Sequence, residues 1–169
     1  MIRTRLETPR LNLRLFTLDD VQAMFDLNAD PDVIRYAEPT AVESLDEARK
    51  LMQDGPLSDY RKYGYGRFAV EWKETGEVIG FCGIKHIPEI NLPEIGYRYL
   101  KRFWGRGIAT EAARACVGFA REDLKISKLV ALIVAENAAS IRVAEKLGMA
   151  RGPLIHIYET DAYQYEMLL

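Results

Sequence analysis

The stretch Trp104-Gly105-Arg106-Gly107-Ile108-Ala109-Thr110-Glu111 joins a glycine turn to the first turn of an amphipathic helix. Glycine at positions 105 and 107 permits positive φ angles and lets a ligand approach the backbone closely. The amides that open the helix have no intrahelical acceptor and lie at the positive end of the helix dipole, where an anion is stabilised. This stretch therefore predicts a turn that binds phosphate.

The segments on either side of the turn indicate the fold class. Residues 67–72 have a period of two and are joined by a turn at 74–77 to the segment 78–84, which predicts a hairpin. A third strand at 94–100 extends it to an antiparallel meander before the glycine turn. After the turn, residues 108–119 have the apolar spacing of a helix that packs on a sheet. Residues 129–134 form a continuous apolar run, typical of a strand covered on both faces. Strand, helix and buried strand predict a βαβ unit with a parallel pair of strands.

The remaining segments complete a mixed α+β chain that we interpret as one domain spanning residues 1–169. Asn137 is suited to cap a short helix that ends at Gly148, while Pro93 and Gly96 indicate a bulge in the strand that contains them. We also expect a first strand at 11–15, helices at 17–25 and 43–60 with an interruption at Gly55-Pro56, and final strands at 155–158 and 163–168.

The composition excludes several classes of partner and location. The chain has 23 basic and 25 acidic residues and a pI near 5.8, so no general positive field favours nucleic acid or an anionic membrane. It has no apolar run near the roughly 20 residues of a membrane span and no signal peptide at its start, so we expect a cytoplasmic protein. His86 and His156 have no second ligand at a suitable spacing, and we predict no metal site.

The spacing of the glycine turn separates three kinds of phosphate ligand. A P-loop requires a lysine directly after its last glycine, and Ile108 occupies that place. A dinucleotide-binding turn requires a third glycine where Thr110 stands, and it follows a parallel rather than an antiparallel strand. The pyrophosphate of coenzyme A is the third ligand.

Four motifs follow one another along the chain: Glu94-Ile95-Gly96-Tyr97, Trp104 to Ala112, Asn137-Ala138-Ala139-Ser140-Ile141 and Glu145-Lys146-Leu147-Gly148-Met149. In this order they resemble the GNAT superfamily of N-acetyltransferases, and in particular its ribosomal-protein N-terminal (alanine) acetyltransferase-like subfamily. The segment Thr8–Arg14 also resembles that subfamily's first strand, so the likeness covers nearly the whole chain. The resemblance implies a GNAT fold with a central, mostly antiparallel twisted sheet of six or seven strands, a parallel pair in its middle, and about four helices on both faces.

The resemblance also implies how the cosubstrate, acetyl-CoA, is bound. In the family, backbone groups of the strand after the bulge bond the pantetheine arm, and the turn at the start of the helix binds the pyrophosphate. Asn137 both caps its helix and contacts the pantetheine in this reading. The implied cofactor-binding residues are Tyr97, Arg98, Tyr99, Gly105, Arg106, Gly107, Ile108, Ala109, Thr110 and Asn137.

The same resemblance implies direct acetyl transfer to an amine, without a covalent enzyme intermediate. An attacking amine must be neutral, and an α-amino group with a pKa of about 7.7 to 8.0 needs only a modest base. Glu94 is the candidate base, acting directly or through a water molecule. Many family members place a tyrosine seven residues after the asparagine to assist the leaving thiolate, but Ala144 stands there, and we assign a hydrogen-bonding role to Ser140.

Several alternatives stay open at this point. The favoured acceptor is a protein N-terminus, and the alternatives are a small amine such as a polyamine or antibiotic. The absent tyrosine also keeps a non-catalytic acyl-CoA sensor in consideration, and a nucleotide-binding module is a third reading. We expect the acceptor to be selected by residues 30–65, 86–92 and 155–163, and a homodimer is one option for assembly.

Overall fold

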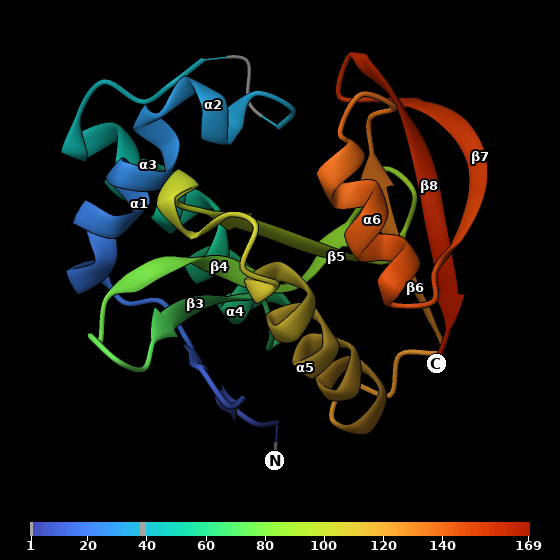
Figure 1. Cartoon of the computed structure of the whole chain (residues 1–169), viewed down its shortest axis with the longest axis horizontal. Coiled ribbons are helices and arrows are strands. Elements are labelled where there is room, and N and C mark those ends of the chain that lie inside the picture. The colour runs from blue at the N-terminus through green and yellow to red at the C-terminus, as the bar shows by residue number, and fades with distance from the viewer. Residues whose placement is uncertain (1, 38–39) are drawn as a thin grey trace.

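The computed structural model describes residues 2–37 and 40–169 and contains a sheet with helices on both faces (Figure 1). Within these residues, eight strands form one sheet in the order β1-β2-β3-β4-β5-β6-β8-β7. Neighbouring strands are antiparallel except β5 and β6, which are parallel. The strands are β1 Arg5–Glu7, β2 Leu11–Arg14, β3 Arg67–Trp72, β4 Val78–Ile87, β5 Leu92–Tyr99, β6 Lys128–Ile133, β7 Ala150–Ile157 and β8 Thr160–Leu168.

The helices lie on opposite faces of this sheet. Tyr99 and Cys82 pack with Cys116 of α5 on one face, whereas Arg98 on β5 bonds Asn28 of α1 on the other. Because successive side chains of a strand point to opposite faces, α5 and α1 are on different sides of the sheet. The helices are η1 Leu18–Asp20, α1 Val21–Ala29, α2 Pro31–Ile34, α3 Leu45–Asp54, α4 Pro56–Tyr63, η2 Lys101–Phe103, α5 Ile108–Glu122 and α6 Ala138–Lys146.

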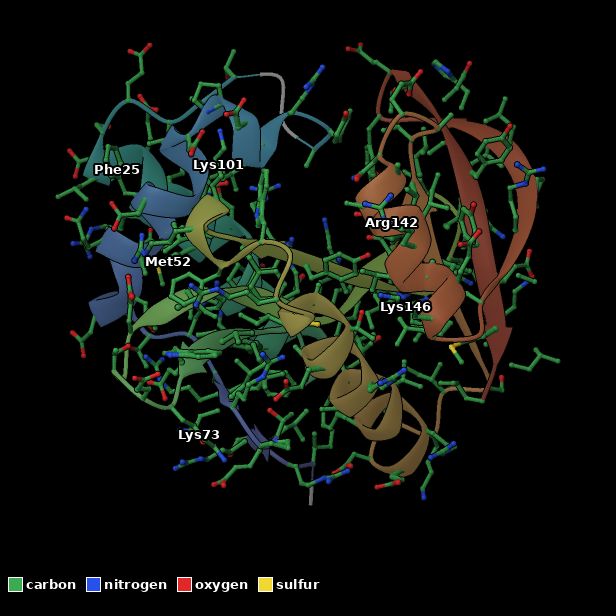
Figure 2. The ribbon with its side chains drawn as sticks, in the orientation of Figure 1. Phe25, Met52, Lys73, Lys101, Arg142 and Lys146 are labelled. Atoms are coloured by element: carbon green, nitrogen blue, oxygen red, sulfur yellow. The ribbon has the colours of Figure 1, made fainter. Side chains whose placement is uncertain are left out.

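The two helical layers form by different packing. On α5 the buried side chains repeat at helical spacing. The ring of Phe119 packs edge to face on the ring of Phe68 in β3, with the ring centres 5.3 Å apart. On the other face α3 packs mainly on α1, and its Met52 is fully buried (Figure 2). Gly55 and Pro56 separate α3 from α4, because proline ends a helix that reaches it and starts the next one.

The structure differs from the sequence-based expectation in three details. It has eight strands in its described residues, because β1 is three residues long and too short to show a periodic pattern. The helix α2 has four residues and was not expected for the same reason. The predicted bulge at Pro93 and Gly96 is wrong, since β4 and β5 pair without interruption from Gly80–Tyr99 to Ile87–Leu92.

The irregularity that the sequence placed inside β5 lies instead between β5 and β6. These parallel strands pair at one register position, Glu94 opposite Val130, and then diverge. In Figure 1 the strands from β1 to β5 and the strands β6 to β8 form two arms, with α6 beside the second arm. The edge of β5 that faces β6 is therefore left without a strand partner over most of its length.

In the part of the chain that the structure describes, no helix is long and apolar enough to span a membrane.

Candidate active site

Strand β5 separates two surfaces of the site, because its side chains alternate between the faces of the sheet. Tyr97 points toward α6, where its hydroxyl donates a hydrogen bond to the backbone carbonyl of Ser140 at 3.3 Å. Arg98 points the other way and donates to Asn28 of α1. Glu94 lies four residues before Arg98 and therefore on the same face of the strand. We call the face of Glu94 and Arg98 the acceptor face and the face of Tyr97 the thiol face.

Gly96 leaves an open space at the middle of β5. A Cβ built on Gly96 would meet no atom within 4 Å, and its φ is not positive, so the backbone itself does not require glycine. Gly96 belongs to the acceptor-face set, between Glu94 and Arg98, with Tyr97 next to it on the opposite face. The space beside the strand is therefore free where the two surfaces of the site meet.

Glu94 ends the parallel ladder with its side chain. The amide of Leu132 in β6 donates to Oε1 of Glu94 at 3.2 Å. If β5 and β6 stayed paired, this amide would instead bond a backbone carbonyl of β5. Burial raises the pKa of Glu94, while the Leu132 hydrogen bond and the charges of Arg67 and Lys85 act against this rise. A carboxylate with a raised pKa is suited to accept a proton near neutral pH.

Tyr97, Ser140 and Asn137 meet at the start of α6. Asn137 is the N-cap of α6, and its Oδ1 accepts a hydrogen bond from the amide of Ser140 at 3.2 Å, which confirms the predicted cap. Burial raises the pKa of Tyr97 to about 12, and the charge of Glu94 adds to the rise. The phenol is therefore a neutral O–H donor at physiological pH. Sequence reasoning assigned only the backbone of Tyr97 to the site and missed this hydroxyl.

The glycine turn has the geometry that its sequence predicts. Gly105 and Gly107 both have φ of 73°, and Gly107 is the N-cap of α5 without a side-chain cap. The first intrahelical bond runs from the amide of Glu111 to the carbonyl of Gly107 at 3.1 Å. Within the described residues, the preceding amides from Gly105 to Thr110 donate no backbone hydrogen bond. These donors are available to an anion.

Two contacts fix the turn relative to the rest of the protein. The indole N–H of Trp104 donates to the carbonyl of Tyr99 at 2.8 Å, which ties the turn to the end of β5. Lys101 forms an ion pair with Asp32, which ties η2 to α2 (Figure 2). Arg106, a predicted phosphate contact, has its guanidinium 5.4 Å from the centre of the Phe103 ring.

Glu111 connects the turn to the loop before β2. Its carboxylate accepts hydrogen bonds from the Thr8 hydroxyl at 2.6 Å, the Arg10 amide at 3.0 Å and Arg10 Nε at 2.7 Å. Arg10 also donates to the carbonyl of Arg106 inside the turn at 2.9 Å. Burial alone would raise the pKa of Glu111, but these partners outweigh it and lower the pKa. In the sequence, both segments resemble the same family, but nothing in it indicated that Glu111 contacts Thr8 and Arg10.

A small cavity of about 60 Å³ lies on the acceptor face. Phe81 is at its wall, with the guanidinium of Arg67 4.9 Å and that of Arg98 5.4 Å from the ring centre. The other lining residues are Phe16, Met24, Asn28, Leu51 and Pro56. We expected residues 30–65 to help select the acceptor, and Arg67 lies just after that range. The sequence did not single out Arg67, because only the pairing of β3 with β4 brings it beside the site.

The donor groups and the open space fit coenzyme A. The amides of the turn are placed for a pyrophosphate, and the unpaired edge of β5 exposes backbone groups of the kind that bond a pantetheine amide. In the described part of the chain, no cluster of three His, Cys, Asp or Glu side chains is arranged to hold a metal ion.

A model of the acetyltransferase (GNAT) domain matches residues 10–150. The chain belongs to the GNAT family. It is an acyl-CoA-dependent N-acetyltransferase, as its domain and its N-acetyltransferase relatives show.

The similarity to other proteins extends over nearly the full chain. The uncharacterized protein YkkB of Bacillus subtilis is 36% identical over 97% of this chain and 95% of its own. The crystal structure of an acetyltransferase from Agrobacterium tumefaciens is 30% identical, with a TM-score of 0.83 over 96% of this chain and 93% of that one.

Two solved GNAT structures of lower identity share the fold alone. The ribosomal-protein acetyltransferase RimL, in complex with coenzyme A, is 22% identical with a TM-score of 0.82, over 99% of this chain and 97% of that one. A spermidine N-acetyltransferase chimera that includes Vibrio cholerae sequence is 20% identical with a TM-score of 0.76, over 94% and 95%. The GNAT fold therefore accompanies both protein and polyamine acceptors.

Proposed function

We propose that this protein transfers an acetyl group from acetyl-CoA directly to a primary amine in a ternary complex, with a protein N-terminal α-amino group as the favoured acceptor. The observation that carries the proposal is that the side chains of β5 point to two different faces of the sheet. Glu94 lies on the acceptor face, the Tyr97 hydroxyl lies with Ser140 on the thiol face, and Gly96 leaves open space between them. A base and a hydrogen-bond donor are thus available on opposite sides of one reacting centre.

Binding of the cosubstrate uses backbone groups for the most part. The amides of Gly105, Arg106, Gly107, Ile108, Ala109 and Thr110 hold the pyrophosphate, and the edge of β5 from Tyr97 to Tyr99 extends along the pantetheine. Bound acetyl-CoA supplies an activated thioester. Asn137 keeps α6 in place at the far side of the channel through its bond to the Ser140 amide.

Glu94 acts as the general base in this proposal. Its carboxylate takes a proton from the acceptor amine, directly or through a water molecule, so that the lone pair of the nitrogen is free to attack. The amide of Leu132 holds one carboxylate oxygen at 3.2 Å and orients the group. The raised pKa of Glu94 brings it closer to that of an α-amino group, which makes the transfer less unfavourable.

Tyr97 and Ser140 assist the departing sulfur. A neutral phenol with a pKa of about 12 donates a hydrogen bond to a developing thiolate without losing its own proton. Ser140 offers a second hydroxyl on the first turn of α6. The proposal thereby supplies a donor although Ala144, which is buried, occupies the place of the family's usual tyrosine.

The α-amino acceptor is favoured over a lysine side chain on acid–base grounds. An α-amino group has a pKa of about 7.7 to 8.0 and is partly neutral at pH 7, whereas a lysine near 10.4 is almost fully protonated. A single carboxylate such as Glu94 is a sufficient base for the first but a weak one for the second.

Thiol release from acetyl-CoA, measured with a panel of N-terminal peptides and small amines, tests this proposal. We expect turnover with peptides that have a free N-terminus and none with the same peptides after N-terminal acetylation. Glu94→Gln should lower kcat by about 100-fold and remove the Glu94 ionisation from the acidic limb of the pH–rate profile, leaving the ionisation of the acceptor amine. Binding of acetyl-CoA without turnover for any amine would instead identify a non-catalytic sensor.

A further inference from the structure

The cavity beside Arg67 is the right size for one small group of a ligand. Its volume of about 60 Å³ compares with the roughly 10–15 Å³ that one water needs when volume is measured in the same way. It therefore admits a carboxylate and its adjoining methylene, but not a whole peptide or polyamine. The Phe81 ring and the side chains of Leu51 and Pro56 supply apolar parts of its lining.

Arg67 brings a positive charge to this cavity and has no anionic partner among residues 2–37 and 40–169. Its guanidinium lies over the Phe81 ring at 4.9 Å and, within the described residues, makes no hydrogen bond or ion pair. The side chain is half-buried, so part of its hydration is lost. A planar guanidinium with free donors is the group best shaped to bind a carboxylate through two parallel hydrogen bonds.

In the part of the chain that the structure describes, the nearby carboxyl groups do not supply that partner. Asp59 and Glu94 are within electrostatic range of Arg67, yet neither forms an ion pair with it. Burial raises the pKa of both carboxyl groups, and Oδ2 of Asp59 is buried without a hydrogen-bond partner. The positive charge of Arg67 is therefore left for a ligand.

The sheet connects this cavity to the reacting centre. On the acceptor face the paired residues of β4 and β5 follow in the order Phe81–Arg98, Gly83–Gly96 and Lys85–Glu94. A Cβ built on Gly96 meets no atom within 4 Å, whereas the backbone of residues 66–68 covers Gly83, so a ligand reaches Glu94 over Gly96 alone. Arg67 is paired with Gly83 from the other side and stands at the same height as this glycine pair.

We propose that Arg67 binds a carboxylate of the acceptor while the acceptor's amine lies at Glu94, so that the substrates are N-terminal peptides with an acidic side chain at the first or second residue. This inference rests on the proposed function and specifies its substrate class.

Acetylation of matched peptides tests the proposal. The pair Ala-Glu-Ala-Ala and Ala-Gln-Ala-Ala, both amidated at the C-terminus, differ only in one carboxylate. We expect kcat/KM at least 10-fold higher for the acidic peptide, with the difference mainly in KM. Arg67→Gln should reduce the ratio to near 1 by slowing the acidic peptide alone, and Arg67→Lys should keep part of it. Arg121→Gln, an exposed arginine on α5, should leave the ratio unchanged and controls for net charge.

Equilibrium binding provides a readout that does not depend on turnover. Titration calorimetry of each peptide against the protein with coenzyme A should give a Kd at least 10-fold lower for the acidic peptide, and Arg67→Gln should remove the difference. Equal Kd values and equal kcat/KM for the pair overturn the inference while leaving the proposed function in place. A preference for spermidine overturns both the inference and the favoured acceptor. Arg67-dependent binding without acetylation of any amine overturns the proposed function instead. If 5-aminopentanoate surpasses both peptides, the peptide acceptor is wrong.

Discussion

The hydroxyl of Tyr97 on β5 donates a hydrogen bond to the backbone carbonyl of Ser140 on α6 at 3.3 Å. The two residues are 43 positions apart, and the contact crosses the place where β5 and β6 diverge. It links the strand that borders the proposed pantetheine channel to the helix on its far side. In the proposed reaction this hydroxyl turns its single proton from the Ser140 carbonyl to the leaving sulfur.

Tyr97→Phe removes that donor and keeps the ring. We expect kcat to fall by about 100-fold because the developing thiolate loses its hydrogen bond, with little change in KM for acetyl-CoA. Steady-state kinetics measure both. Ser140→Ala is the matched variant for the second hydroxyl, and a combined variant shows whether the two act together. An unchanged kcat in Tyr97→Phe would assign the residue a structural role only.

Gly96→Ala places a methyl group in the open space beside β5. The new Cβ meets no atom within 4 Å, and alanine accepts this backbone, so we expect the free energy of unfolding to change by less than about 1 kcal/mol. The methyl group displaces substrate, and kcat/KM should fall by about 100-fold. Urea unfolding and kinetics separate the two effects. Gly118→Ala, which also adds a methyl group in open space, but on α5, should leave kcat/KM intact.

Glu94→Gln is expected to stabilise the protein above pH 5 while impairing catalysis. The folded pKa of Glu94 is raised, so the folded state binds more protons than the unfolded state between the usual glutamate pKa of about 4.3 and the folded value. Stability from this group therefore falls as pH rises through that window, and glutamine has no such loss. We expect a gain in the free energy of unfolding at pH 8 that shrinks toward pH 4, measured by urea unfolding. A gain that does not vary with pH contradicts the assignment.

Glu111→Gln should weaken both the fold and cosubstrate binding. Replacing one carboxylate oxygen by an amino group breaks the bond to Arg10, and we expect a loss of about 2 kcal/mol. The folded pKa of Glu111 is lowered, so its contribution is present above the usual glutamate pKa and is lost as pH falls through the folded value. KM for acetyl-CoA should rise several-fold because Arg10 no longer holds the turn. Glu145→Gln on α6 is the exposed control.

Local patterns in the sequence predicted the elements that carry the cosubstrate site. The positive φ angles at Gly105 and Gly107, the Asn137 cap and the helical stripe of α5 each depend on a few consecutive residues. Such features are set by backbone sterics and by hydrogen bonds within one turn. The same reasoning failed for β1 and α2, which are too short to show a period, and for the bulge assigned to Pro93 and Gly96.

The sequence by itself determined the family resemblance, the alternation of β5 and the types of residue available for chemistry. Only the tertiary structure decided which of them meet. The parting of β5 from β6, the position of Tyr97 against Ser140 and the placement of Arg67 beside Phe81 join segments that are distant in the chain. Periodicity tells which side chains share a face of an element. The register and packing of whole elements fix the neighbours across that face, because many long-range contacts must be satisfied at once.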